Sequence, residues 1–216
     1  VAESATNDPQ SAYTYLGQVA NQNHSTIPKT SLSIDGTVLN YDGQNYFVWT
    51  TEAAIYINKM LDPQTIDPDT DPVKLVSCTE KFELLSASLV EGPGFISHGD
   101  KLFMTYSVND STSEFYSIGL MTFKNTSGNG VMDISNWSKK TDGPVVSKSD
   151  KNGIYGTGHN AFVKYKTDTG FVDYMTYQAH LDPTESAWVG RNTFVMPIYW
   201  DRNGDPIFRE PSAEVY

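Results

Sequence analysis

The stretch Glu91-Gly92-Pro93-Gly94-Phe95-Ile96-Ser97-His98-Gly99 repeats the pattern of an earlier stretch, Asp35-Gly36-Thr37-Val38-Leu39-Asn40-Tyr41-Asp42-Gly43. In both stretches an acidic residue and a glycine open a short run that ends, eight residues after the acid, at a turn glycine. A second strand-like run follows each turn. Successive copies of one supersecondary unit occupy equivalent places in a fold, so units that pack around an axis would bring Asp35 and Glu91 together there.

The rest of the chain predicts an all-β protein with a single domain, residues 1–216. Apolar and β-branched runs continue to Phe208 with no sustained helical period, and 38% of the residues are hydrophobic, which is enough for a core. Hairpin turns are predicted at Asp42-Gly43, Gly99-Asp100, Asp168-Thr169-Gly170 and Asn203-Gly204. At roughly 40–50 residues per four-stranded blade, the length predicts about four propeller blades. Residues 1–30 lack this pattern and are interpreted as a linking segment.

Charge and composition argue against two classes of partner. The chain carries 26 acidic and 15 basic residues, a formal charge of -11, which repels nucleic acid and anionic membrane surfaces. No apolar run approaches the ~20 residues that span a bilayer. Four sequons favour an extracellular, glycosylated protein; their acceptors are Asn23, Asn109, Asn125 and Asn136.

A third polar residue, His159, follows the same pattern as the two acids. Gly158-His159-Asn160 opens another strand in the same manner, so the repeat predicts that His159 points toward the same axis as Asp35 and Glu91. A single histidine in a strand is more often structural than functional. The repeat is the reason for considering His159 a candidate site residue. The sequence contains no nucleophile elbow, P-loop or paired-histidine zinc helix.

Taken in order along the chain, these motifs resemble glycoside hydrolase family 43, the family of arabinanases, arabinofuranosidases and xylosidases. The resemblance runs through Ser33–Thr37, Glu91–Pro93, Gly158–Asn160 and Trp188–Arg191, and it covers nearly the whole chain. It implies a five-bladed β-propeller with the active site in a funnel on the axis. By this resemblance the chain supplies about four blades and lacks the N-terminal one.

The resemblance also implies roles for individual residues. Glu91 is the general acid, Asp35 orients it and tunes its pKa, and His159 lies near an axial ion, for which calcium is the candidate. Substrate contacts are implied for Arg191 and for Ile34, which precedes Asp35. Aromatic side chains in propellers more often belong to the core, but the candidates for stacking on sugars are Trp49, Tyr106, Tyr155 and Trp188.

The implied activity is inverting hydrolysis of α-L-arabinofuranosyl linkages in plant cell-wall arabinan or arabinoxylan, by a secreted enzyme. An inverting enzyme needs a second carboxylate as base, roughly 6.5–9.5 Å from the acid. The family's base precedes a proline in the first blade, upstream of this chain, and Asp8-Pro9 only imitates that dipeptide. We therefore expect a separate N-terminal segment as a partner.

The alternative is a non-catalytic carbohydrate-binding remnant or one fragment of a nicked enzyme. The sequence leaves open arabinose against xylose, and attack at chain ends against internal attack.

Overall fold

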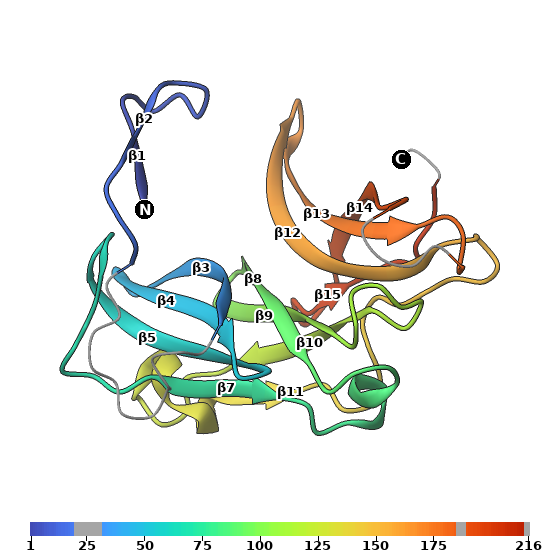
Figure 1. Cartoon of the computed structure of the whole chain (residues 1–216), viewed down its shortest axis with the longest axis horizontal. Helices are drawn as coiled ribbons and strands as arrows, with labels where there is room; N and C mark the ends of the chain where they lie inside the picture. Colours follow the sequence, from blue (N-terminus) through green and yellow to red (C-terminus); the bar gives the residue numbers. More distant parts are fainter. Residues whose placement is uncertain (20–31, 185–188, 214–216) are drawn as a thin grey trace.

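The computed structural model describes residues 1–19, 32–184 and 189–213, and within them the fold is all-β, as predicted. Three antiparallel sheets have four or five strands each, and a two-stranded hairpin precedes them (Figure 1). The hairpin is β1 (Ala2–Ser4) and β2 (Tyr13–Tyr15). The first sheet contains β3 (Ser33–Tyr41), β4 (Gln44–Thr51), β5 (Ala54–Asp62), β6 (Thr65–Ile66) and β7 (Val73–Ser77). The second contains β8 (Val90–His98), β9 (Lys101–Val108), β10 (Ser117–Phe123) and β11 (Trp137–Lys139). The third contains β12 (Tyr155–Thr167), β13 (Gly170–His180), β14 (Asn192–Trp200) and β15 (Pro206–Ile207).

Helical structure in the described residues is limited to short 3-10 turns. These are η1 (Lys81–Leu84), η2 (Gly130–Met132) and η3 (Ile134–Asn136). None of the described helices is long and apolar enough to cross a membrane.

In each sheet the strands pair mainly with their neighbours in sequence, and the exception is β7, which pairs with β5. The turn between β3 and β4 is formed by Asp42 and Gly43, which both have positive φ angles, 51° and 76°. Two consecutive left-handed residues make the turn type that matches the twist of a hairpin, which is why an Asp-Gly pair occupies it. The predicted turns at residues 99–100, 168–170 and 203–204 are likewise confirmed.

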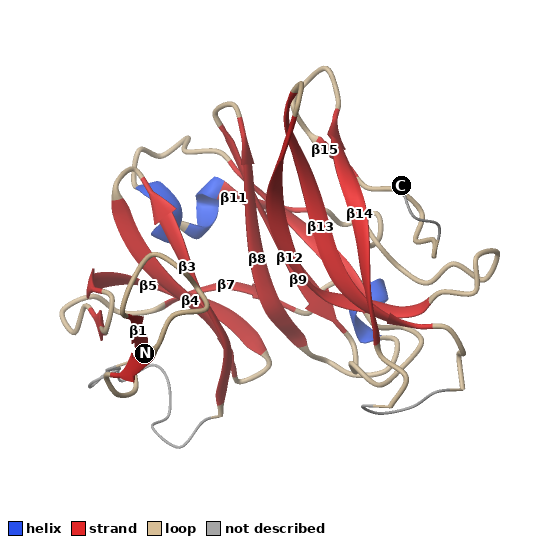
Figure 2. Ribbon diagram, turned by 90° about the horizontal axis from the view of Figure 1, so that it is seen from above, coloured by secondary structure: helices blue, strands red, loops and turns tan. Residues whose placement is uncertain are grey.

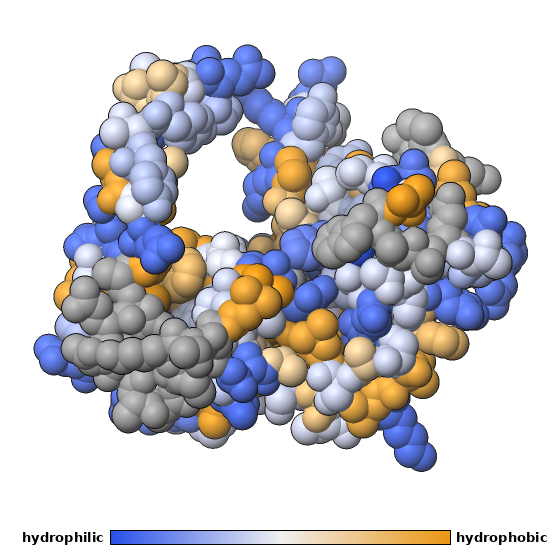
Figure 3. Space-filling model, in the orientation of Figure 1, coloured by the Kyte–Doolittle hydropathy of each residue, from blue (hydrophilic) through white to orange (hydrophobic). Residues whose placement is uncertain are grey.

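The innermost strands of the three sheets lie side by side, with β8 between β3 and β12 (Figure 2). The sheets do not close into a ring within the described residues. The β1–β2 hairpin stands apart from the body, and open space separates it from the β12–β13 hairpin (Figure 3). Residues 1–30, expected as a linking segment, thus contain a hairpin, while residues 20–30 fall outside the described ranges.

Two apolar clusters join the sheets. The first fills the space between the first and second sheets around Val48, Ile57 and Met104, and the second joins the second and third sheets around Phe103 and Met175. All five side chains are at most 1% exposed. Burying such a side chain stabilises the fold by about 1.5–3 kcal/mol, so these interfaces hold the inner strands at a fixed spacing.

Two of the predicted glycosylation acceptors are buried. Asn109 and Asn136 are 0% and 2% exposed, and their amide nitrogens donate to backbone carbonyls inside the protein. A glycan is attached through that nitrogen, so neither residue can carry one in the folded protein. Asn125 is exposed, and Asn23 lies outside the described residues.

Candidate active site

The three innermost strands each carry a β-bulge near their start. The pairing with the next strand shifts immediately after Ile34, Glu91 and Gly158. The residue that follows each of them adopts a positive φ: 56° at Asp35, 59° at Gly92 and 49° at His159. Aspartate and histidine tolerate this conformation at a cost, and such strain is concentrated at functional sites.

The bulges correct the register of the sequence repeat. Because Asp35 and Gly92 occupy the same bulge position, the repeat spacing is 57 residues rather than the 56 that aligned Asp35 with Glu91. Glu91 is instead equivalent to Ile34. The alignment on the turn glycines was misleading, because the glycine is second in the Asp42-Gly43 turn and first in Gly99-Asp100.

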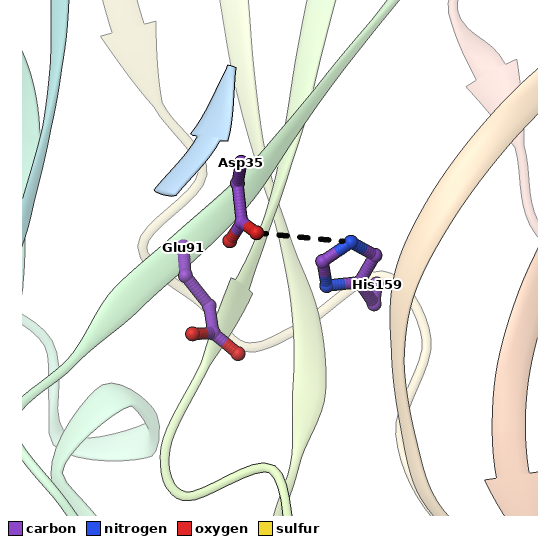
Figure 4. A group of neighbouring side chains, drawn as sticks. All are labelled: Asp35, Glu91 and His159. Atoms are coloured by element: carbon purple, nitrogen blue, oxygen red, sulfur yellow. Dashed lines mark ion pairs between the residues drawn. The ribbon is translucent and has the colours of Figure 1, made fainter. Parts of the chain in front are cut away.

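Despite this shift, the structure brings together the three residues that the sequence singled out. Ligand atoms of Asp35, Glu91 and His159 lie within 4.8 Å of one another (Figure 4). Asp35 Oδ1 and His159 Nε2 are 4.0 Å apart, and Asp35 Oδ2 accepts a 2.9 Å hydrogen bond from the backbone N–H of Gly92. The N–H beside Glu91 therefore fixes Asp35 next to it.

Glu91 has the properties of a proton donor. The residue is only 8% exposed, and this burial is the main cause that raises the pKa of its carboxyl; the nearby charge of Asp35 raises it further. A 2.6 Å hydrogen bond from the Tyr116 hydroxyl to Glu91 Oε1 opposes the rise, as do the charges of His159 and Arg191. The net effect is a raised pKa, so Glu91 holds its proton more readily than an ordinary glutamate does.

The two predicted substrate contacts, Arg191 and Ile34, lie at or just before the start of a strand. Arg191 precedes β14, and its charge acts on Glu91. Its Nη2 donates 3.0 Å hydrogen bonds to both the carbonyl and the hydroxyl of Ser111, which hold the guanidinium in place. Ile34 is 37% exposed and precedes Asp35 at the start of β3.

The predicted stacking aromatics are placed differently from our expectation. Trp49 and Tyr106 are 2% and 0% exposed, so the structure puts both rings in the core, where no sugar can reach them. Trp49 stacks between Phe47 and Tyr56. Tyr155 is half-buried in β12, and Trp188 lies outside the described residues.

One residue of the site was missed by sequence reasoning. Tyr116 lies one residue before β10 and is 0% exposed, yet its hydroxyl touches the candidate acid. It belongs to none of the repeated motifs. In the sequence it is one of 13 tyrosines beside an apolar strand, a context that predicts a core residue.

The predicted axial calcium can be tested against the donor set. Calcium prefers about six to eight oxygen ligands, whereas this cluster offers two carboxylates and one imidazole nitrogen. The raised pKa also favours a neutral Glu91, which is a poor cation ligand. The three side chains therefore do not fit calcium by themselves.

A cavity of about 390 Å³ lies along the inner strands next to this cluster. Asp35, Gly92 and His159 line it together with residues farther along β3, β8 and β12. Asp8, which imitates the family's base, is elsewhere: it is exposed in the turn of the N-terminal hairpin, where its Oδ1 accepts the N–H of Gln10.

Comparison with protein families identifies the family of the chain. The model of glycosyl hydrolases family 43 matches residues 1–206. The chain belongs to this family. The match confirms the resemblance deduced from the motifs, and the solved family members are β-propellers, in agreement with sheets arranged side by side around inner strands.

Individual family-43 relatives are named for arabinose-releasing activities. The chain is 28% identical over 228 residues to the extracellular exo-α-(1→5)-L-arabinofuranosidase of Streptomyces avermitilis, covering 99% of this chain and 44% of that protein. It is 26% identical to α-L-arabinofuranosidase 43 of Humicola insolens, covering 84% and 38%. The crystal structure of α-L-arabinofuranosidase from Lactobacillus brevis superposes with a TM-score of 0.85 at 27% identity, covering 100% and 66%. The chain spans less than half the length of the two curated relatives.

Proposed function

We propose that this chain supplies the proton-donating side of a glycoside hydrolase active site that cleaves α-L-arabinofuranosyl linkages in arabinan or arabinoxylan. The observation that carries the proposal is Glu91, a buried carboxyl whose pKa is raised by burial and by Asp35 next to it. The names of the Streptomyces, Humicola and Lactobacillus relatives support arabinofuranose as the sugar.

The mechanism follows from the protonation states. Glu91 gives its proton to the glycosidic oxygen as the bond from that oxygen to the anomeric carbon breaks, so the leaving group departs as a neutral alcohol. Burial, and to a lesser degree the nearby charge of Asp35, favour the proton on Glu91 until that moment, because a second negative charge nearby is unfavourable. The cations of Arg191 and, when protonated, His159 offset the charge that Glu91 acquires.

We further propose single displacement with inversion, in which a water attacks the anomeric carbon from the other face. The attacking water loses its proton to a second carboxylate, roughly 6.5–9.5 Å from the acid. We assign no residue of this chain as that base. The complete active site is proposed to be that of a five-bladed propeller in a secreted protein, consistent with the word "extracellular" in the name of the Streptomyces relative. An axial calcium ion remains a prediction of the resemblance.

The test compares wild-type protein containing residues 1–216 with its Glu91→Gln variant. Release of 4-nitrophenol from the α-L-arabinofuranoside and the β-D-xyloside is measured, together with reducing sugar from linear arabinan. We expect the wild type to hydrolyse the arabinofuranoside and arabinan. We expect the rate of Glu91→Gln on arabinan to be lower by a factor of about 10²–10⁴. Glu3→Gln is the matched control, because Glu3 is exposed in the N-terminal hairpin. Full activity in Glu91→Gln would refute the role of Glu91. Binding of arabino-oligosaccharides without hydrolysis in either protein would favour the carbohydrate-binding alternative.

A further inference from the structure

Tyr116 reaches Glu91 through a gap that only glycine leaves open. Its ring is 0% exposed and passes next to Gly158 in β12. A Cβ atom on Gly158 would lie 2.0 Å from Cε1 of the tyrosine ring, far closer than two carbons approach. Gly158 holds the position before the bulge that Glu91 holds in β8, so one sheet provides the acid and the next provides room for its partner.

Ser107 is a second polar neighbour of the phenol. It lies directly across the β8–β9 ladder from Glu91, and its hydroxyl accepts a 2.7 Å hydrogen bond from the backbone N–H of His159. Burial raises the pKa of Tyr116 well above its usual value, the charge of Glu91 adds to this rise, and a hydrogen bond with Ser107 opposes it. Tyr116 is therefore a neutral phenol, held as a donor between two polar neighbours.

Because Tyr116 donates to one carboxyl oxygen of Glu91, the two oxygens of this carboxyl have different roles. Tyr116 occupies Glu91 Oε1 at 2.6 Å, which leaves Oε2 to carry the transferable proton. When that proton moves to the leaving oxygen, Glu91 becomes a carboxylate, and hydrogen bonds to an ionised acceptor are about twice as strong as neutral ones. The contact thus strengthens as the transition state is reached, which is the condition for a contribution to rate.

We propose that Tyr116 is a positioning residue that orients Glu91 for proton transfer and stabilises the carboxylate formed by it. The inference rests on the proposed function of Glu91 as the general acid. The balance of the step is unchanged: the proton of Glu91 passes to the departing oxygen, and the proton of the attacking water passes to the base.

The experiment is the Tyr116→Phe variant, assayed with two leaving groups. Arabinobiose has a poor leaving group and needs protonation, whereas 2,4-dinitrophenyl α-L-arabinofuranoside has a leaving group that departs as an anion. We expect kcat on arabinobiose to fall about 10- to 100-fold with KM unchanged, and kcat on the dinitrophenyl substrate to fall less than about 3-fold.

Tyr106→Phe is the matched control. Tyr106 is also a fully buried tyrosine that donates to a buried glutamate, Glu83, at 2.7 Å, and it also passes beside a glycine, Gly119. Tyr106→Phe removes a hydroxyl from the core, as Tyr116→Phe does, but this hydroxyl donates to Glu83 and not to Glu91. We expect a lower midpoint of thermal unfolding but the same ratio of activities on the two substrates as in the wild type.

An equal loss on both substrates in Tyr116→Phe, or no loss on arabinobiose, would overturn the inference, as would a leaving-group effect of the same size in Tyr106→Phe. If Tyr116→Phe does not fold, Ser107→Ala decides by the same ratio: a loss confined to arabinobiose supports the inference and an equal loss overturns it. Failure of the proposed function is recognised separately, because Glu91→Gln would then keep its activity on arabinobiose.

Discussion

Glu83→Gln tests how the segment that leads into the acid's strand is anchored. Glu83 lies in η1, seven residues before β8 begins, and its side chain is fully buried. Its Oε1 accepts hydrogen bonds from the hydroxyl of Tyr106 at 2.7 Å and from Lys139 at 2.9 Å. Its Oε2 accepts the backbone N–H groups of Thr79 and Glu80, at 2.6 and 2.9 Å, and a second contact from Lys139. Every group around this carboxylate is a donor.

A glutamine cannot satisfy this arrangement, because its amide has one oxygen. The best placement keeps oxygen at the Oε2 position for the two backbone N–H groups and turns the NH₂ toward Tyr106, whose hydroxyl can rotate to accept. The ammonium of Lys139 then loses its charge partner and faces another donor, although it keeps its bond to the carbonyl of Ser77. Breaking a buried ion pair costs about 3–5 kcal/mol, and the retained bond points to the lower end, about 3 kcal/mol.

The assay is unfolding by urea and by heat. A loss of about 3 kcal/mol predicts a fall in Tm of roughly 6–12 °C, at about 2–4 °C for each kcal/mol in a chain of this size. Burial raises the pKa of Glu83, but the hydrogen bonds from Glu80, Thr79, Lys139 and Tyr106 outweigh it and lower the pKa overall. Its contribution to stability is therefore present at neutral pH and lost as the pH falls, so wild type and variant should converge on acidification.

The control is Asp142→Asn, because Asp142 pairs with Lys140 at the surface and its side chain is 80% exposed. This control should leave the free energy of unfolding unchanged within error. A loss below about 1 kcal/mol in Glu83→Gln, or an equal loss in the control, would refute the reasoning.

Three further predictions concern the site. Asp35→Asn removes the charge that helps raise the pKa of Glu91, so the alkaline limb of the pH profile of kcat/KM should move to lower pH; an unmoved limb would contradict the coupling. Gly158→Ala should displace the Tyr116 ring and reproduce the selective loss on arabinobiose, and wild-type activity would contradict the packing argument. Proton NMR at early reaction times should show the β-anomer of arabinose forming first from an α-linked substrate, whereas the α-anomer would exclude inversion.

The fold and the cluster could be predicted from the sequence because both rest on local signals. Turn pairs such as Asp42-Gly43 have a steric reason to appear where they do, and the alternation of strands and turns defined the all-β class. Asp35, Glu91 and His159 were found because each opens an inner strand. The register was wrong by one residue because the turn glycine occupies different positions in the two hairpins, and the bulges that reveal the true register leave no signal in the sequence.

The remaining features depend on contacts between distant segments. Tyr116 acts on Glu91 across 25 residues of sequence, and its function depends on a missing Cβ at Gly158 in another sheet. Trp49 and Tyr106 show the converse, since an aromatic residue in a strand has the same local pattern whether its ring faces a sugar or the core. Burial is decided by how the sheets pack, which the one-dimensional pattern does not contain.

The central claim is that Glu91 donates the proton, and the leaving-group dependence of Glu91→Gln tests it most directly. The measurement is kcat/KM of wild type and variant on arabinobiose and on 2,4-dinitrophenyl α-L-arabinofuranoside. A general acid predicts a loss of about 10²–10⁴ on arabinobiose and a loss below about 10-fold on the dinitrophenyl substrate, which needs no protonation. Equal losses on the two substrates, or an undiminished rate on arabinobiose, would contradict the assignment.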